Sequence, residues 1–154
     1  MKLLRWIVVA ILLTITGAQA QSPPHSSDRD ALIGAWHLVR IDAPGAEANA
    51  APAPQPKGML IYTRDGHMSV QLMYPKSADS PDNEYVVGGY EASFGSYDLD
   101  DAKHIVTHHV QGSVTRDLLV GKDLPRVYQL TSDGHLIIHS SDSSEHWSVT
   151  WQHY

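Results

Sequence analysis

The sequence contains no cysteine and only one phenylalanine among its 154 residues. Without thiols the chain forms no disulfides, so the folded state has to be stabilised by its core. Basic residues are also scarce, with 11 Lys and Arg against 17 Asp and Glu. Because an acidic chain repels polyanions, we expect no nucleic-acid partner. The lack of cysteine and of a Gly-x-Ser-x-Gly motif leaves no recognisable nucleophile for covalent catalysis.

The first twenty residues predict a signal peptide rather than part of the fold. Lys2 and Arg5 precede an apolar run at residues 6–15, and Ala18 and Ala20 form a small-residue cleavage pattern. Cleavage after Ala20 predicts a periplasmic or secreted protein. The run is shorter than the about 20 apolar residues that span a bilayer. We therefore expect no stable membrane insertion after cleavage; an uncleaved N-terminal anchor is the alternative.

The remainder of the chain predicts one domain behind a short tether. Residues 21–27 are rich in Ser and Pro and predict a flexible tether, followed by a single domain at residues 28–154. A short helical turn is expected over residues 28–33. Asp28 or Asp30 is the expected cap, because a carboxylate accepts hydrogen bonds from the free N–H groups of a helix start.

Short alternating segments separated by turn residues predict an all-β fold. Turns at residues 64–66 and 132–134 mark two hairpins. Short connections favour up-and-down order, and closure removes exposed edges, so we expect a single antiparallel β-barrel of about eight strands. A barrel of this size has room for its own side chains or for one small ligand. The predicted strands cover residues 36–41, 58–63, 67–73, 93–99, 104–111, 126–131, 135–140 and 146–153, with 115–120 as a further candidate.

Two longer connections interrupt this pattern. Residues 43–56 are dominated by Ala, Pro and Gly and cannot pair as a strand, because proline removes backbone donors. They predict either a lid over a ligand site or a slack surface loop. Residues 74–89 are rich in Pro, Asp and Gly, with one helical turn expected near residues 84–87.

Several motifs resemble the lipocalin-like domain family of small bacterial and fungal proteins. Gly34-Ala35-Trp36 is similar to the lipocalin Gly-x-Trp signature, in which the Trp plugs the closed end of the barrel. The match runs from about Leu32 to Trp151, and its strongest part is Lys57–Gln71, followed by Phe94–Tyr97, Thr107–Val110 and Arg126. The resemblance implies a barrel but leaves function loosely defined; some fungal relatives occur with secondary-metabolite pathways, which implies isomerase or cyclase roles.

The chain departs from the family pattern at its C-terminus. Trp151 is followed by Gln152, where relatives have an Arg that lies across the signature Trp. If a cation covers Trp36, Arg126 or Arg40 has to supply it.

Strand alternation predicts which side chains face the barrel interior. Trp147, Val149 and Trp151 share one face, and their apolar character points that face inward. For residues 58–63 the pattern leaves open whether Met59 and Ile61 or Leu60 and Tyr62 face in. The ligand-binding set we predict is Met59, Met68, Tyr97, His109, Arg126, Tyr128, Trp147 and Trp151.

This set suits an apolar or amphipathic ligand with a carboxylate or carbonyl group. An Arg forks onto a carboxylate, Tyr and His donate hydrogen bonds, and Trp and Met form an adaptable apolar wall. The alternative is a filled barrel in which Arg126 and His109 form a structural polar pair. Oligomeric state is left open by the sequence.

Catalysis and metal binding are the other two hypotheses. His109 and Tyr97 are the catalytic candidates of a cofactor-free isomerase or cyclase, moving a proton next to a carbonyl while Arg126 stabilises the enolate. The ten His residues suggest metal, but residues four apart on a strand lie about 13 Å apart, too far to share one ion. Only neighbouring strands, for example through His139 and His108, would hold a metal. We expect neither a metal nor a cofactor.

Overall fold

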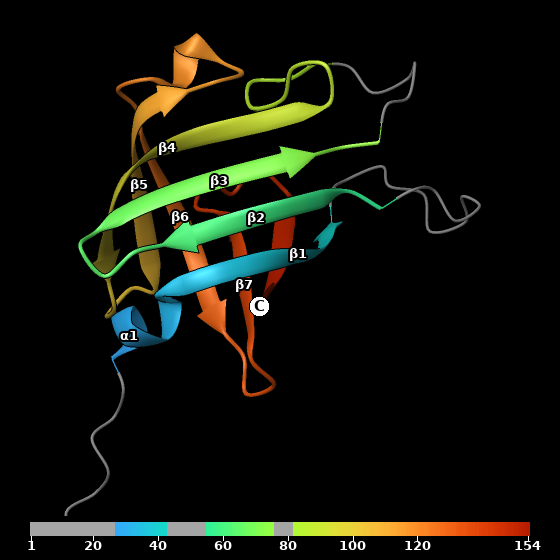
Figure 1. Cartoon of the computed structure of the whole chain (residues 1–154). Coiled ribbons are helices and arrows are strands. Elements are labelled where there is room, and N and C mark those ends of the chain that lie inside the picture. Colours follow the sequence, from blue (N-terminus) through green and yellow to red (C-terminus); the bar gives the residue numbers. More distant parts are fainter. Residues whose placement is uncertain (1–26, 43–54, 76–81) are drawn as a thin grey trace, which may run out of the picture.

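The structure is a closed barrel of eight antiparallel strands in sequence order, with β1 also pairing with β8 (Figure 1). It is a computed structural model that describes residues 27–42, 55–75 and 82–154. The strands are β1 (Gly34–Asp42), β2 (Lys57–Tyr62), β3 (His67–Met73), β4 (Tyr90–Asp100), β5 (Ile105–Ser113), β6 (Asp123–Leu130), β7 (His135–Ser140) and β8 (Ser148–His153). The predicted up-and-down barrel is confirmed.

Two predicted elements are wrong. The candidate strand at residues 115–120 is instead a connection that contains the 3₁₀ turn η1 (Asp117–Leu119). Val110 and Gly121 bond across this connection, so β5 pairs directly with β6 and leaves no edge for another strand. The expected helical turn at residues 84–87 is also absent; Val87 forms an isolated bridge with Tyr90 instead.

The predicted N-terminal turn is present as helix α1 (Asp28–Leu32), but its cap differs. Ser27 caps it, because the Ser27 hydroxyl accepts from the Asp30 N–H at 3.3 Å. Asp28 and Asp30 lie in the first turn, where carboxylates still favour the positive end of the helix dipole. Leu32 is fully buried, which anchors α1 across one end of the barrel.

We call the end of the barrel that carries α1 the closed end. It also holds the turns at residues 63–66, 101–104 and 131–134. Trp36 is 1% exposed there, and its indole N–H donates to the Leu32 carbonyl at 2.9 Å. Neither Arg126 nor Arg40 covers this Trp. The His153 ring does, with the ring centroids 3.6 Å apart.

Inward-facing residues form one core, and the structure decides the case that alternation left open. Leu60 and Tyr62 of β2 face in, so Met59 faces out. The inward placement of Val149 and Trp151 is confirmed. The buried core cluster consists of Leu32, Trp36, Leu60, Tyr62, Met68, Val70, Leu72, Tyr97, Val106, Tyr128, Leu136, Ile138, Val149 and Trp151.

A β-bulge shapes the middle of the β4–β5 pair. Gly95 pairs with Val110 while Phe94 pairs with Gly112, so Gln111 is the extra residue. A Cβ on Gly95 would lie only 2.0 Å from the His109 carbonyl oxygen, so only glycine fits this close approach. Because of this extra residue, the alternation of inward-facing and outward-facing side chains along β5 changes phase at residue 111.

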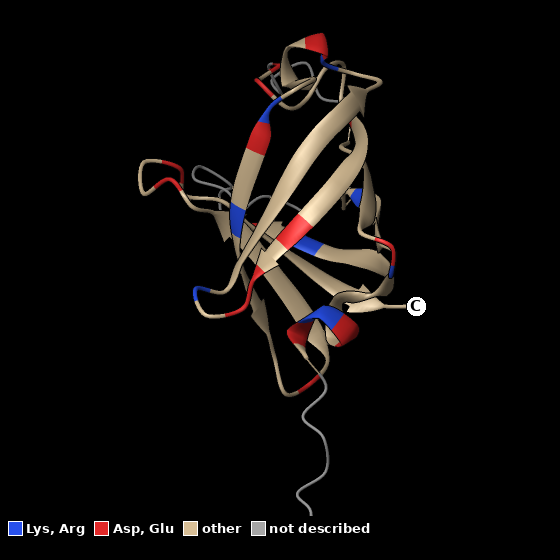
Figure 2. Cartoon of the chain, turned by 90° about the vertical axis from the view of Figure 1, so that its left-hand side faces the viewer, with Lys and Arg blue, Asp and Glu red and all other residues tan. Residues whose placement is uncertain are grey.

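Charged residues lie mostly at the turns and at α1, and the others are spread over several strands (Figure 2). No helix in the described ranges is long and apolar enough to cross a membrane. The predicted signal peptide, nearly all of the tether and most of the Pro/Ala-rich connection fall outside the described residues.

Candidate functional site

A cavity of about 270 Å³ lies in the half of the barrel away from the closed end, which we call the cavity half. Its size is near the lower limit of small-molecule sites in proteins. Most of the lining is apolar, with a few polar groups among it. The lining residues are Ile41, Leu60, Val70, Leu72, Tyr74, Asn83, Tyr85, Val86, Glu91, Ser93, His108, Val110, Leu119, Leu124, Arg126, Ile138, Trp147, Val149 and Trp151.

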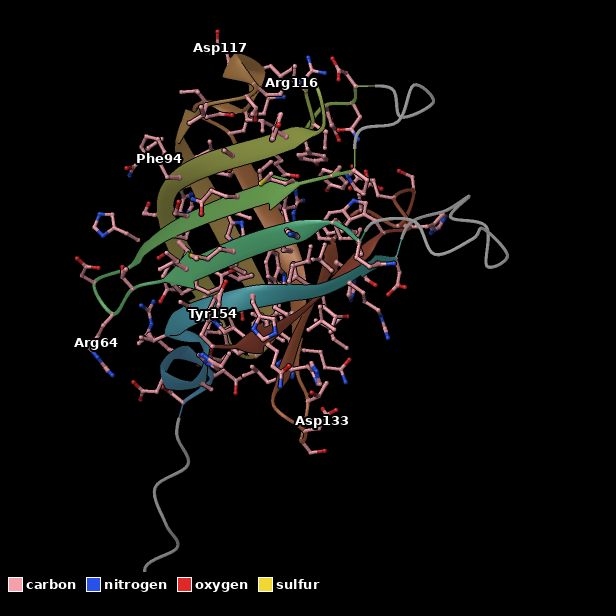
Figure 3. The ribbon with its side chains drawn as sticks, turned by 45° about the vertical axis from the view of Figure 1, so that its right-hand side comes forward. Arg64, Phe94, Arg116, Asp117, Asp133 and Tyr154 are labelled. Carbon is pink, nitrogen blue, oxygen red and sulfur yellow. The ribbon has the colours of Figure 1, made fainter. Side chains whose placement is uncertain are left out.

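Two connections complete the cavity wall beyond the strand ends. Residues 82–87 supply Tyr85 and Val86, and η1 supplies Leu119. Arg116 ties the two together, because its guanidinium donates to the Asn83 carbonyl and to the Val86 carbonyl at 3.4 Å. Figure 3 places Arg116 and Asp117 at the opposite end from Arg64 and Asp133. The wall is therefore held at the end opposite α1.

Arg126 is the buried cation of the cavity, with 8% of its surface exposed. Its guanidinium carbon lies 5.3 Å from the Tyr85 ring centroid and 5.0 Å from the Trp147 ring centroid. One of its N–H groups donates to the Pro125 carbonyl at 3.2 Å. Within the described ranges no carboxylate oxygen lies within 4 Å of the guanidinium. The charge thus faces the cavity without an ion-pair partner there.

His108, which lines the cavity, forms a buried neutral pair with Tyr62. The Tyr62 hydroxyl lies 2.6 Å from His108 Nε2. Burial, with help from the nearby Arg126 charge, lowers the pKa of His108 to about 3, so the imidazole is neutral at pH 7. Burial also raises the pKa of the Tyr62 hydroxyl, which stays protonated. This is the histidine that the barrel directs inward.

Glu91 is the acidic group of the cavity. Burial raises its pKa to about 7, and the Arg126 charge only partly opposes this. Tyr74 lies beside it, and burial raises the pKa of that hydroxyl as well. Near neutral pH the Glu91 carboxyl therefore exchanges between its charged and neutral forms, which is unusual for a glutamate.

The cavity contains three of the eight side chains predicted to bind a ligand. Arg126, Trp147 and Trp151 all line it, and Arg126 packs against the Trp147 ring. The Trp147 indole N–H donates to the Glu145 carboxylate at 2.9 Å, which fixes the ring orientation. Trp151 is buried, and its indole N–H has no hydrogen-bond partner among the described residues.

Four other predicted residues lie elsewhere. Met68, Tyr97 and Tyr128 are buried in the core but do not border the cavity; Met59 faces outward. The Tyr97 hydroxyl donates to the Thr63 carbonyl at 3.0 Å, and the Tyr128 hydroxyl donates to Asp28 at 2.8 Å. Both partners belong to the closed end, so these two tyrosines seal the barrel rather than face a ligand.

The inward placement of His109 is wrong. Its ring lies on the outer face between two carboxylates, with Nδ1 2.6 Å from Asp123 and Nε2 3.0 Å from Asp98. These hydrogen bonds, chiefly the one to Asp123, raise the pKa of His109. His109 therefore meets neither Tyr97 nor Arg126, which removes both the predicted catalytic pair and the predicted structural pair.

The sequence carried signals for two cavity residues that the prediction missed. His108 shares its face of β5 with Val106 and Val110, and two flanking valines favour the interior. Glu91 precedes the predicted start of its strand by two residues. Extending β4 to Tyr90 places Glu91 on the same face as Ser93 and Gly95. No comparable pattern marks Tyr85, which reaches the cavity from a connection.

The histidines do not assemble a metal centre in the part of the chain that the structure describes. No group of three or more His, Asp or Glu side chains there could hold an ion. His108 faces the cavity, whereas His139 alternates with the inward Leu136 and Ile138 and lies on the other face. The cross-strand pair considered from the sequence therefore does not form.

Comparison with known proteins identifies a family. No curated protein matches the sequence. The lipocalin-like domain family matches residues 33–154, from the residue before β1 to the C-terminus. That range contains all eight strands and the whole cavity lining. With its Gly-x-Trp start and its closed eight-stranded barrel, the chain belongs to the lipocalin-like domain family.

Proposed function

We propose that this protein is an exported binding protein that encloses one small apolar or amphipathic ligand in the cavity half of its barrel. The observation that carries the proposal is the cavity of about 270 Å³, walled by aliphatic and aromatic side chains with a few polar groups. A buried apolar space with sparse polar groups is the usual form of a small-molecule site. The family's barrel architecture agrees with this use.

The test is binding of the neutral fluorescent probe 1-aminoanthracene, followed by its emission as protein is added. We expect saturable binding to the wild-type protein. Ile138 lines the cavity, so the Ile138→Trp variant fills the space and abolishes binding. Its neighbour Ile137 lies on the other face of β7, so Ile137→Trp is the matched control and keeps full binding.

Circular dichroism checks that both variants fold. A wild-type protein that takes up no probe contradicts the proposal. Equal binding by the Ile138→Trp and wild-type proteins contradicts it as well, because the probe then binds outside the cavity.

Export is tested separately from binding. The proposal rests on the basic start, the apolar run and the small residues that end at Ala20. Mass spectrometry of the protein isolated from its own host should show a mature chain that begins at Gln21. Recovery of a chain that still carries residues 1–20 contradicts cleavage.

A further inference from the structure

The polar groups at the cavity present hydrogen-bond donors that lack internal acceptors. Arg126 carries five N–H donors; one donates to the Pro125 carbonyl and another bonds to the Tyr85 hydroxyl, so most of the five lack an acceptor within the described ranges. The faces of the Tyr85 and Trp147 rings also hold the guanidinium in place, and they leave these remaining donors free. A buried guanidinium in this state is strongly favoured by an anionic acceptor.

His108 adds a second donor through its tautomer. The Tyr62 hydroxyl is buried, and in the described ranges His108 Nε2 is the acceptor it reaches, at 2.6 Å. Because a buried hydroxyl donates its proton where it can, Nε2 is the unprotonated nitrogen of the neutral ring. The proton of His108 then resides on Nδ1, which has no hydrogen-bond partner within the described ranges. His108 borders the cavity, so this N–H is a donor for a guest.

The carboxyl groups near Arg126 do not take the place of a guest anion. Glu145 accepts the Trp147 indole N–H at 2.9 Å and makes no ion pair with Arg126 within 4 Å. Glu91 also lies beyond ion-pair distance, and its buried carboxyl holds a proton up to near-neutral pH. The donors of Arg126 and His108 are therefore available to a ligand.

We propose that the ligand is an apolar carboxylic acid, bound as its carboxylate against Arg126 and His108, with its apolar body against the aliphatic wall. Leu60, Val70 and Ile138 form part of this aliphatic wall. This inference rests on the proposed function, because it names the chemical class of ligand for the same cavity. The inference excludes neutral alcohols and esters as the preferred ligands when their chain length equals that of the acid.

The test compares decanoate with 1-decanol as competitors that displace 1-aminoanthracene at pH 7. The two compounds have the same chain length, so their difference in affinity reports on the head group. We expect decanoate to bind at least about tenfold more tightly, as one charge-assisted hydrogen-bond pair supplies. Arg126→Met should bring the ratio of the two affinities close to one, because decanoate loses the cation that binds its carboxylate while 1-decanol has no charge to lose.

Two further variants keep the test decisive. Arg40 lies exposed on the outer face of β1, so Arg40→Met removes an equal charge and should preserve the decanoate preference. Arg126→Lys keeps the positive charge but loses the two parallel N–H donors of the guanidinium, so we expect an intermediate preference for decanoate over 1-decanol. This variant replaces Arg126→Met in the test if Arg126→Met does not fold.

Equal displacement by decanoate and 1-decanol in the wild-type protein overturns the carboxylate inference while enclosed binding stands. A preference that survives Arg126→Met also overturns it. Failure of the wild-type protein to bind 1-aminoanthracene or either competitor overturns the proposed function itself.

Discussion

At the closed end of the barrel the polar atoms of the large aromatic side chains are bonded to nearby groups, whereas in the cavity half the charged groups of the described residues line the cavity. Trp36, Tyr97 and Tyr128 each bond to a backbone carbonyl or a carboxylate of α1 or a neighbouring turn. Arg126 and Glu91 border the cavity, and neither makes an ion pair with another described residue. Among the described residues, one half therefore pairs these buried polar groups internally, whereas the other half holds buried charges without an ion pair.

The difference indicates a division of labour along the barrel axis. Satisfied buried polar groups add stability and fix one arrangement, because leaving them unpaired is costly. Unpaired buried charges do the reverse, and proteins tolerate this cost mainly at functional sites. We therefore expect substitutions of polar groups to have opposite effects on stability in the two halves.

The largest expected effect is at the closed end. Trp36→Ala removes a side chain that is 1% exposed and leaves a cavity under α1, so the free energy of unfolding should fall by about 3–5 kcal/mol. Trp147→Ala, in the cavity half, removes a partly buried Trp and should cost much less while weakening 1-aminoanthracene binding. Urea unfolding and probe titration measure the two effects. Equal losses of stability would remove the distinction between the halves.

The next effect depends on pH and comes from Glu91. Its pKa is about 7 in the folded state and about 4.5 when exposed, so the unfolded chain ionises first as pH rises. Stability should fall between these two pH values and remain low above pH 7. Glu91→Gln should remove this loss, raising the free energy of unfolding at pH 8 by on the order of 3 kcal/mol and leaving it unchanged at pH 4. A variant that is no more stable at pH 8 would contradict a buried Glu91.

A smaller pair of substitutions tests the change of sign directly. Tyr128→Phe removes the 2.8 Å hydrogen bond to Asp28 and should cost about 1 kcal/mol in the free energy of unfolding. Arg126→Met replaces a buried cation, which has no ion-pair partner among the described residues, by an apolar chain of similar length, so its stability should equal or exceed that of the wild-type protein. Urea midpoints at pH 7 give both values. Destabilisation by Arg126→Met would mean that Arg126 has a structural partner.

The barrel could be predicted from the sequence because its signals are local. Turns such as 64–66 and 132–134, together with period-two alternation, predict the hairpins, and β3 and β7 begin and end at the predicted residues. The N-terminal turn and the inward face of β8 follow from the same patterns. The 115–120 segment was misassigned because its residues favour a strand, but no neighbouring strand is available to pair with it.

The site was harder to predict because alternation gives two faces without saying which is inside. On β5 we predicted that His109 faces inward, but His108 does. On β2 we predicted Met59 as a ligand contact, but Leu60 faces inward. The position of each side chain along the barrel axis was also not given by the alternation pattern. Tyr97 and Tyr128 do face inward, as expected, but they lie at the closed end instead of the cavity. A single strand's pattern does not specify how far from the end a ligand sits.

The smallest predicted effect concerns the outer face, where His109 bridges Asp98 and Asp123. Its pKa is raised by these partners, so its contribution to stability is full below about pH 6.5 and is lost as pH rises through the higher folded-state value. His109→Gln should therefore lower the free energy of unfolding at pH 6 by less than about 1 kcal/mol, as for other partly exposed ion pairs. The loss should vanish at pH 9 and shrink in 0.5 M NaCl, while decanoate and 1-aminoanthracene affinities stay unchanged, because His109 is separated from the cavity by the barrel wall. A loss of ligand affinity in this variant would mean that His109 contributes to the binding site, and it would contradict the separation between a structural half and a ligand-binding half of the barrel.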